Sequence, residues 1–79
     1  MQLVVDVGNT ETVVGIAPRV TEVSAHWRIS SAVPRTPDEL TALLRTLLAG
    51  DGIEPSRIER AVIGSVVPAL NQVWTETLS

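Results

Sequence analysis

The chain has 79 residues, no cysteine and no lysine, and a formal net charge of −3 with a pI near 4.9. This length allows one domain at most, and the absence of cysteine excludes a disulfide framework and a thiolate metal site. Six scattered arginines in an acidic chain argue against nucleic-acid binding, and no apolar stretch reaches the ~20 residues that cross a bilayer. Without cysteines or a basic-plus-apolar signal pattern, we expect a cytoplasmic protein.

Three strands are predicted in the first part of the chain. Gln2–Val7 is almost continuously apolar, which is typical of a strand covered on both faces of a sheet. The second strand is predicted over Thr12–Ala17, and a turn at Pro18-Arg19 leads to a third strand near Thr21–Ile29. The third strand alternates, so two sets of side chains should face opposite ways, namely Val23, Ala25, Trp27 and Ile29 against Ser24, His26, Arg28 and Ser30.

A helix, a strand and a second helix should follow a short polar, proline-containing link. Thr36, Pro37 and Glu39 are typical of a helix start, with an N-cap, a proline at the first helical position and a capping box. This helix should bury a leucine stripe and end at two glycines, which are Leu40, Leu43, Leu44, Leu47, Leu48, Gly50 and Gly52. Ala61–Val67 is a second apolar run that should lie inside the sheet. Pro68 opens the last helix, whose buried face should comprise Leu70, Val73, Trp74 and Leu78.

The order strand-strand-strand-helix-strand-helix predicts an α/β fold with a mixed sheet, the first half of an RNase H-like (actin-like ATPase) domain. In that arrangement the first strand is central, with the second and third strands antiparallel on one side. The fourth strand lies parallel on the other side, reached by a right-handed crossover through the first helix.

The polar turn Gly8-Asn9-Thr10, between the first two strands, is well suited to bind phosphates. Gly8 lacks a Cβ, so its backbone can take a positive φ and a ligand can approach closely. Successive backbone N–H groups in such a turn form a concave anion site, to which Asn9 and Thr10 add side-chain donors. Asp6, which we expect at the end of the buried first strand, is better suited to hold Mg²⁺ or its water shell against the phosphates. A simple hairpin is the alternative, because Gly-Asn between apolar strands is also a common hairpin signal and needs no ligand.

Four segments resemble the type III pantothenate kinases of the acetate and sugar kinase/Hsp70/actin superfamily, in the same order and at the same spacing. They are Asp6–Gly15, His26–Ser30, Thr36–Leu40 and Ser65–Pro68. Because the first resembles the family's first phosphate-binding motif, the resemblance implies a nucleotide-binding set of Asp6, Val7, Gly8, Asn9, Thr10, Glu11, Thr12 and Val13. It covers only the amino-terminal part of the longer family enzymes. We therefore expect residues 1–79 to be an incomplete N-terminal nucleotide-phosphate-binding domain, truncated at Ser79.

The resemblance implies an ATP-dependent kinase that phosphorylates pantothenate to 4′-phosphopantothenate, the first step of coenzyme A synthesis. It also implies Mg²⁺, held through water by Asp6, a monovalent cation (K⁺ or NH₄⁺), and a homodimer when the enzyme is full length. The general base, the cation ligands and the pantothenate pocket would lie beyond Ser79, so no catalytic residue is predicted here and the chain alone should be inactive. Two alternatives are a non-catalytic regulatory or interaction relative with the same fold, and an inactive fragment.

Glu11 departs from the family pattern, which usually has a neutral or weakly basic residue at this position. A carboxylate that pointed inward would repel a triphosphate, whereas one that pointed to solvent would cost little. The other site candidates are His26 and Arg28, which share a strand face, and Ser65, which is expected to cap the last helix. Structural roles fit Asp38-Glu39, at the helix start, and a solvated connection that contains Asp51, Glu54, Arg57 and Glu59.

Overall fold

The computed structural model describes residues 1–17 and 24–78, and the predicted turn at Pro18-Arg19 and the position of Val23 lie outside them. The predicted order of elements is confirmed, with one short 3₁₀ helix added in the predicted connection after the first helix. The elements are β1 (Gln2–Val7), β2 (Glu11–Ala17), β3 (Ser24–Ser30), α1 (Pro37–Gly50), η1 (Pro55–Arg57), β4 (Arg60–Ser65) and α2 (Pro68–Leu78).

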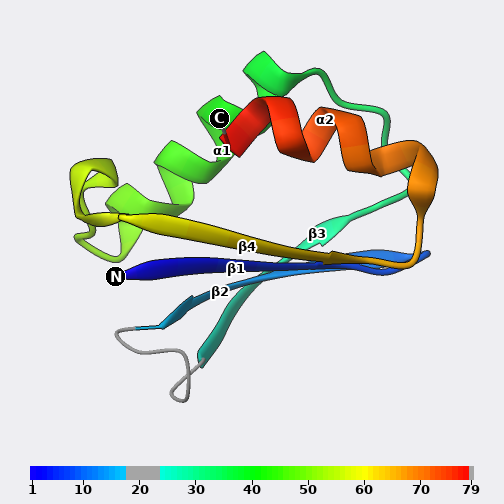
Figure 1. The fold of residues 1–79 in the computed structure, drawn as a ribbon. Coiled ribbons are helices and arrows are strands. Elements are labelled where there is room, and N and C mark those ends of the chain that lie inside the picture. The colour runs from blue at the N-terminus through cyan, green and yellow to red at the C-terminus, as the bar shows by residue number, and fades with distance from the viewer. Residues whose placement is uncertain (18–23, 79) are drawn as a thin grey trace.

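The strands form one four-stranded mixed sheet in the order β3-β2-β1-β4. β1 pairs antiparallel with β2 and parallel with β4, and β2 pairs antiparallel with β3. This is the predicted topology, with the first strand next to both the second and the fourth. The chain passes from β3 through α1 to β4, and both helices lie on one face of the sheet (Figure 1).

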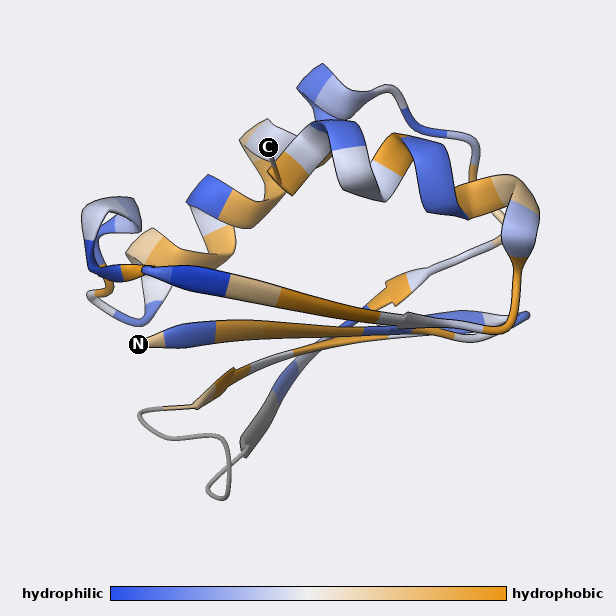
Figure 2. Cartoon of the chain, viewed as in Figure 1, coloured by the Kyte–Doolittle hydropathy of each residue, from blue (hydrophilic) through white to orange (hydrophobic). Residues whose placement is uncertain are grey.

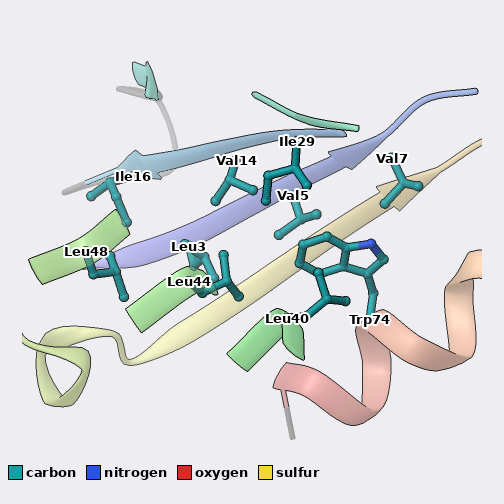
Figure 3. Packing of buried hydrophobic residues seen from close by; sticks show 10 residues of the cluster. All are labelled: Leu3, Val5, Val7, Val14, Ile16, Ile29, Leu40, Leu44, Leu48 and Trp74. Carbon is teal, nitrogen blue, oxygen red and sulfur yellow. The ribbon is translucent and has the colours of Figure 1, made fainter. Parts of the chain in front are cut away.

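The core lies between the helices and the face of the sheet that they cover. Side chains alternate along a strand, so one set from each strand points toward the helices. The buried apolar residues of this layer come from β1, β2, β3, α1 and α2, as Figure 3 shows, and are Leu3, Val5, Val7, Val14, Ile16, Ile29, Leu40, Leu44, Leu48 and Trp74. The leucine stripe of the first helix is confirmed, since three leucines spaced four residues apart are buried and the two others pack against the core as half-buried residues.

The opposite face of the sheet is uncovered in the part of the chain that the structure describes, so the prediction that the first strand is covered on both faces is wrong there. Val4 is half-buried and Asp6 is exposed, because both alternate along β1 with the buried Leu3, Val5 and Val7. Figure 2 shows hydrophobic colouring along much of the strands, although one of their faces has no helix on it. The continuous apolar pattern correctly indicates strands with apolar residues on both faces, but it does not indicate which face the helices cover.

β4 lies at the edge of the sheet. The prediction that the apolar run Ala61–Val67 lies inside the sheet is therefore wrong for the described residues. The strand ends at Ser65, two residues before the predicted end, and Val62 and Val66 are 41% and 69% exposed. After β4, the Val66 N–H donates a hydrogen bond to the Val7 carbonyl over 3.1 Å. This bond ties the start of the β4–α2 connection to the end of β1.

The start of α1 has the predicted capping box. The Glu39 N–H donates to Thr36 Oγ1 over 3.2 Å, and the Thr36 N–H donates to Glu39 Oε1 over 3.0 Å. The hydrogen bond from the Thr36 backbone is the main reason that the pKa of Glu39 lies below its ordinary value of 4.5. The helix ends at Gly50, and Gly52 follows with a φ of 71°, as expected of a glycine that stops a helix.

α2 buries Trp74, with Leu70, Val73 and Leu78 half-buried beside it, so its predicted inner face is confirmed. Together with α1 it completes the single helical layer over the sheet (Figure 1). Neither helix, nor any other in residues 1–17 and 24–78, has the length and apolar character needed to span a membrane.

Candidate phosphate-binding site

Three connections meet at the border of the sheet where β1 and β4 both reach their carboxyl ends (Figure 1). They are the β1–β2 turn, the link from β3 to α1, and the link from β4 to α2. Two backbone hydrogen bonds join them: Ser31 N–H to the Thr10 carbonyl over 2.9 Å, and Val66 N–H to the Val7 carbonyl. In open α/β sheets, ligands bind outside the carboxyl ends of the parallel strands. The border formed by the carboxyl ends of β1 and β4 is therefore the natural place for a ligand.

The β1–β2 turn is a tight hairpin loop with Asn9 and Thr10 at its tip. Val7 pairs with Thr12, and the Gly8 N–H donates to the Glu11 carbonyl over 3.0 Å. Both tip residues are exposed, and within the described residues no hydrogen bond is recorded from either N–H. The turn thus leaves two neighbouring backbone donors without a partner in the described residues, which is one condition for a backbone anion site.

Gly8 is required for a different reason from the one that the sequence suggested. Its φ is not positive, since Gly52 is the one glycine with a positive φ in the described part of the chain. A Cβ on Gly8 would instead lie 2.8 Å from the Glu11 carbonyl oxygen. Because that oxygen accepts the Gly8 N–H, glycine allows the two strands to close into this turn.

The predicted nucleotide-binding residues divide between the two faces of the sheet. Val7 and Thr12 are 0% and 2% exposed and face the helices, so their side chains belong to the core. Thr12 Oγ1 lies 2.8 Å from Ser31 Oγ, which links the turn to the β3–α1 connection. Asp6, Glu11 and Val13 lie on the uncovered face, where a ligand has access.

Asp6 is exposed on the uncovered face, one residue before the end of β1, so the expectation of a carboxylate at the end of a buried strand is wrong. Its strand neighbours in the same row are Val13 on β2 and Gly64 on β4. No group of three or more possible metal ligands occurs among the described residues. A lone exposed carboxylate fits Mg²⁺, which in proteins is held by one or two carboxylates and takes its remaining ligands from water and phosphate.

Glu11 and Arg28 form an exposed ion pair beside the turn. Arg28 Nε lies 3.9 Å from Glu11 Oε2, and the two side chains are 76% and 60% exposed. Glu11 therefore points to solvent on the uncovered face. A phosphate charge ~4 Å from an unpaired Glu11 would be repelled by about 1 kcal/mol in water and by ~4 kcal/mol at an effective dielectric constant of 20.

Ser65 does not cap α2, contrary to the prediction. Its Oγ accepts the Val67 N–H over 3.1 Å and donates to the Val67 carbonyl over 3.2 Å, so it closes a local turn before the helix. Such turns are a common alternative use of a serine hydroxyl. Ser65 nevertheless lies at the same end of the strands as the β1–β2 turn, because β4 pairs in register with β1 and Ser65 is opposite Val7.

His26 is separated from the turn, unlike Arg28. The register of β2 and β3 shifts between Val14 and Gly15, so that His26 has no partner on β2. Its Nδ1 lies 3.6 Å from Asp51 Oδ2, after the end of α1, and Asp51 is therefore more than a solvated connection. His26 thus joins β3 to the residue that follows α1, and it lies away from the β1–β2 turn.

No pattern in the sequence indicated where Ser31 and Arg35 lie in the fold, and both belong to the polar link after β3. They border a small cavity of about 30 Å³ beneath Trp74, close to Thr12. Arg35 Nε is buried and has no hydrogen-bond partner among the described residues. Only the folded arrangement brings this link against the turn, so no local pattern could have revealed it.

A family model and individual relatives of this chain point to the same protein family. A protein-family model described as type III pantothenate kinase matches residues 2–79. The protein of that name from Anaeromyxobacter sp. (strain K) is 46% identical over 70 residues, which are 89% of this chain and 27% of that protein. The one from Moorella thermoacetica is 42% identical over 79 residues, which are 100% of this chain and 31% of that protein. The chain therefore spans less than a third of the length of these relatives.

Proposed function

The chain belongs to the type III pantothenate kinase family, and we propose that it forms the part of such a kinase that binds the phosphates of ATP. The whole protein would transfer the γ-phosphoryl group of ATP to the hydroxyl of pantothenate, giving 4′-phosphopantothenate for coenzyme A synthesis. The observation that carries this proposal is the β1–β2 turn, where the N–H groups of Asn9 and Thr10 have no hydrogen-bond partner in the described residues and follow the exposed Asp6 by three and four residues.

Each part of the turn has a role in this proposal. The two N–H groups bind phosphate oxygens, and the side chains of Asn9 and Thr10 add donors at the exposed tip. Asp6 holds Mg²⁺, directly or through its water shell, and the ion supplies charge neutralisation to the phosphates when it is bound. Phosphoryl transfer depends mainly on such positioning and charge neutralisation, so this edge of the sheet supplies a substantial share of the site.

The remaining parts of the site are assigned to regions of the family proteins that this chain does not cover. They include the general base, the ligands of a monovalent cation (K⁺ or NH₄⁺), the adenosine contacts and the pantothenate pocket. The chain by itself should therefore not phosphorylate pantothenate. We also propose that the whole protein is a cytoplasmic homodimer.

The strand order supports an RNase H-like fold of the actin-like ATPase type. A central first strand, two antiparallel strands on one side, and a parallel fourth strand reached through a helix are what the first half of that fold requires. The uncovered face of the sheet then becomes the side from which the nucleotide approaches, because Asp6 lies there and the helices occupy the other face.

The test is to assay the whole protein for Mg²⁺- and ATP-dependent formation of 4′-phosphopantothenate, with Asp6→Ala as the informative variant. Asp6 is exposed and has no recorded partner in the described residues, so its loss should leave the fold intact while activity falls by orders of magnitude. Glu54→Ala, which removes an exposed carboxylate elsewhere, is the control and should keep activity. Full turnover in Asp6→Ala would reject the role of this residue, and ATP binding without any product would favour the regulatory relative.

A further inference from the structure

The uncovered face beside the β1–β2 turn contains three charged side chains from three strands, which are Asp6 on β1, Glu11 on β2 and Arg28 on β3. Asp6 and Arg28 lie in one row across the sheet, because both pair in register with Val13 of β2. Glu11 lies in the next row toward the turn, opposite Ser30, and its carboxylate meets the Arg28 guanidinium diagonally at 3.9 Å. Two carboxylates and one guanidinium therefore lie on this face of the sheet, in the two rows next to the turn.

This arrangement creates an electrostatic difficulty for a polyphosphate. A cation held by Asp6 neutralises that carboxylate, but Glu11 remains one residue from Thr10 and would repel the incoming phosphates. Arg28 is the cation that the structure places against Glu11. Its guanidinium is always charged and has five N–H donors in a planar fork, so it can bond a carboxylate and a phosphate oxygen at once.

The space for such a ligand is also present. A shallow hollow is lined by Thr10, Glu11, Arg28, Ile29 and Ser30, so the ion pair and the tip of the turn face the same opening. Both charged side chains are more than half exposed, and neither is fixed by a second ion pair in the described residues. Arg28 therefore has room to reach a ligand in this hollow while it stays paired with Glu11.

We propose that Arg28 is a positioning residue for the phosphate chain, which offsets the charge of Glu11 and at the same time contacts a terminal phosphate oxygen when MgATP binds. This inference rests on the proposed function, since it requires the turn to bind ATP phosphates. The proposal predicts two effects that a purely structural ion pair would not have. The effect of Arg28 on binding depends on Glu11, and it is confined to ligands that carry phosphates.

The experiment is a double-mutant cycle in the whole protein with Glu11→Gln, Arg28→Gln and the double variant, using calorimetric titration with MgATP and with adenosine. Arg28→Gln should weaken MgATP binding about fivefold when Glu11 is present, and twofold or less in the Glu11→Gln background. Adenosine binding should be unchanged in all four proteins, and Arg28→Lys should restore part of the loss because it keeps the charge. Arg45→Gln, at an exposed position on α1, controls for the change in net charge.

The outcomes separate the two proposals. An equal loss in both Glu11 backgrounds would overturn the offset of Glu11 by Arg28. No loss at all, or an equal loss for adenosine, would overturn the role of Arg28 in phosphate binding, while the proposed function stands in each case. Failure of the wild-type protein to bind MgATP would overturn both. Thermal melting of each variant checks that the exposed substitutions leave the fold unchanged.

Discussion

Replacing Gly8 with alanine tests whether the closed turn is needed for the site. The new Cβ would lie 2.8 Å from the Glu11 carbonyl oxygen, closer than carbon and oxygen can approach without a shift of backbone. The turn would have to open and weaken the 3.0 Å hydrogen bond from the Gly8 N–H. A lost hydrogen bond costs about 1 kcal/mol, and overpacking typically costs ~1–3 kcal/mol.

A smaller effect opposes this strain. Alanine restricts the unfolded chain more than glycine does, which stabilises the folded state by ~0.4–1 kcal/mol. The expected net result is a loss of about 1–3 kcal/mol in the free energy of unfolding, together with weaker MgATP binding because the N–H groups at the tip move.

The assay is urea unfolding of the whole protein, combined with calorimetric titration of MgATP. Gly50→Ala is the matched control, since Gly50 is the last residue of α1 and a Cβ there meets no atom within 4 Å. This control should be neutral or stabilising by ~0.5–1 kcal/mol, with unchanged MgATP affinity. If Gly8→Ala behaves like Gly50→Ala in both measurements, the steric reasoning for Gly8 is refuted.

Three further predictions concern stability and association. Leu44→Ala, at a core position 6% exposed, should lower the unfolding free energy of the whole protein by about 2–5 kcal/mol, and a loss below ~1 kcal/mol would contradict the packing described. The pKa of Glu39 is lowered in the folded state, so its contribution to stability is present above pH 4.5 and is lost as the pH falls through the lower folded value. The stability difference between wild type and Glu39→Gln in urea unfolding should therefore shrink below pH 4.5, and a constant difference would count against the capping box. Residues 1–79 expressed alone should associate through the outer edge of β4, which has no strand partner in the described part of the chain, and a sharply monomeric species by light scattering would show otherwise.

The features that the sequence predicted well depend on local chemistry. Thr36, Pro37 and Glu39 specify a helix start within four residues, and the leucine spacing specifies its buried face. The strand order followed from the succession of elements, taken together with its resemblance to the first half of an RNase H-like domain and the right-handed crossover rule. The Asp6–Thr10 turn was recognisable for the same reason, since its strand-turn-strand pattern lies in one short segment.

The features that the sequence did not predict depend on which segments meet in space. Asp6 was expected at the end of a buried strand, but the helices cover the other face of the sheet, and no local pattern distinguishes the two faces. The pairing of Glu11 with Arg28 depends on the register between β2 and β3, which residues far apart in the sequence determine. Ser65 has a residue type that suits both a helix cap and a local turn, and its position before Val67 selects the turn.

The most direct test of the central claim is to follow the backbone amide resonances of Asn9 and Thr10 by NMR while the whole protein is titrated with MgATP. If the β1–β2 turn binds phosphates, both resonances should shift strongly and saturate with the same affinity that calorimetry gives, whereas adenosine should leave them in place. Amides of α1, such as that of Arg45, provide the internal reference, because this helix packs on the opposite face of the sheet. Saturable MgATP binding with unshifted Asn9 and Thr10 amides would contradict the account.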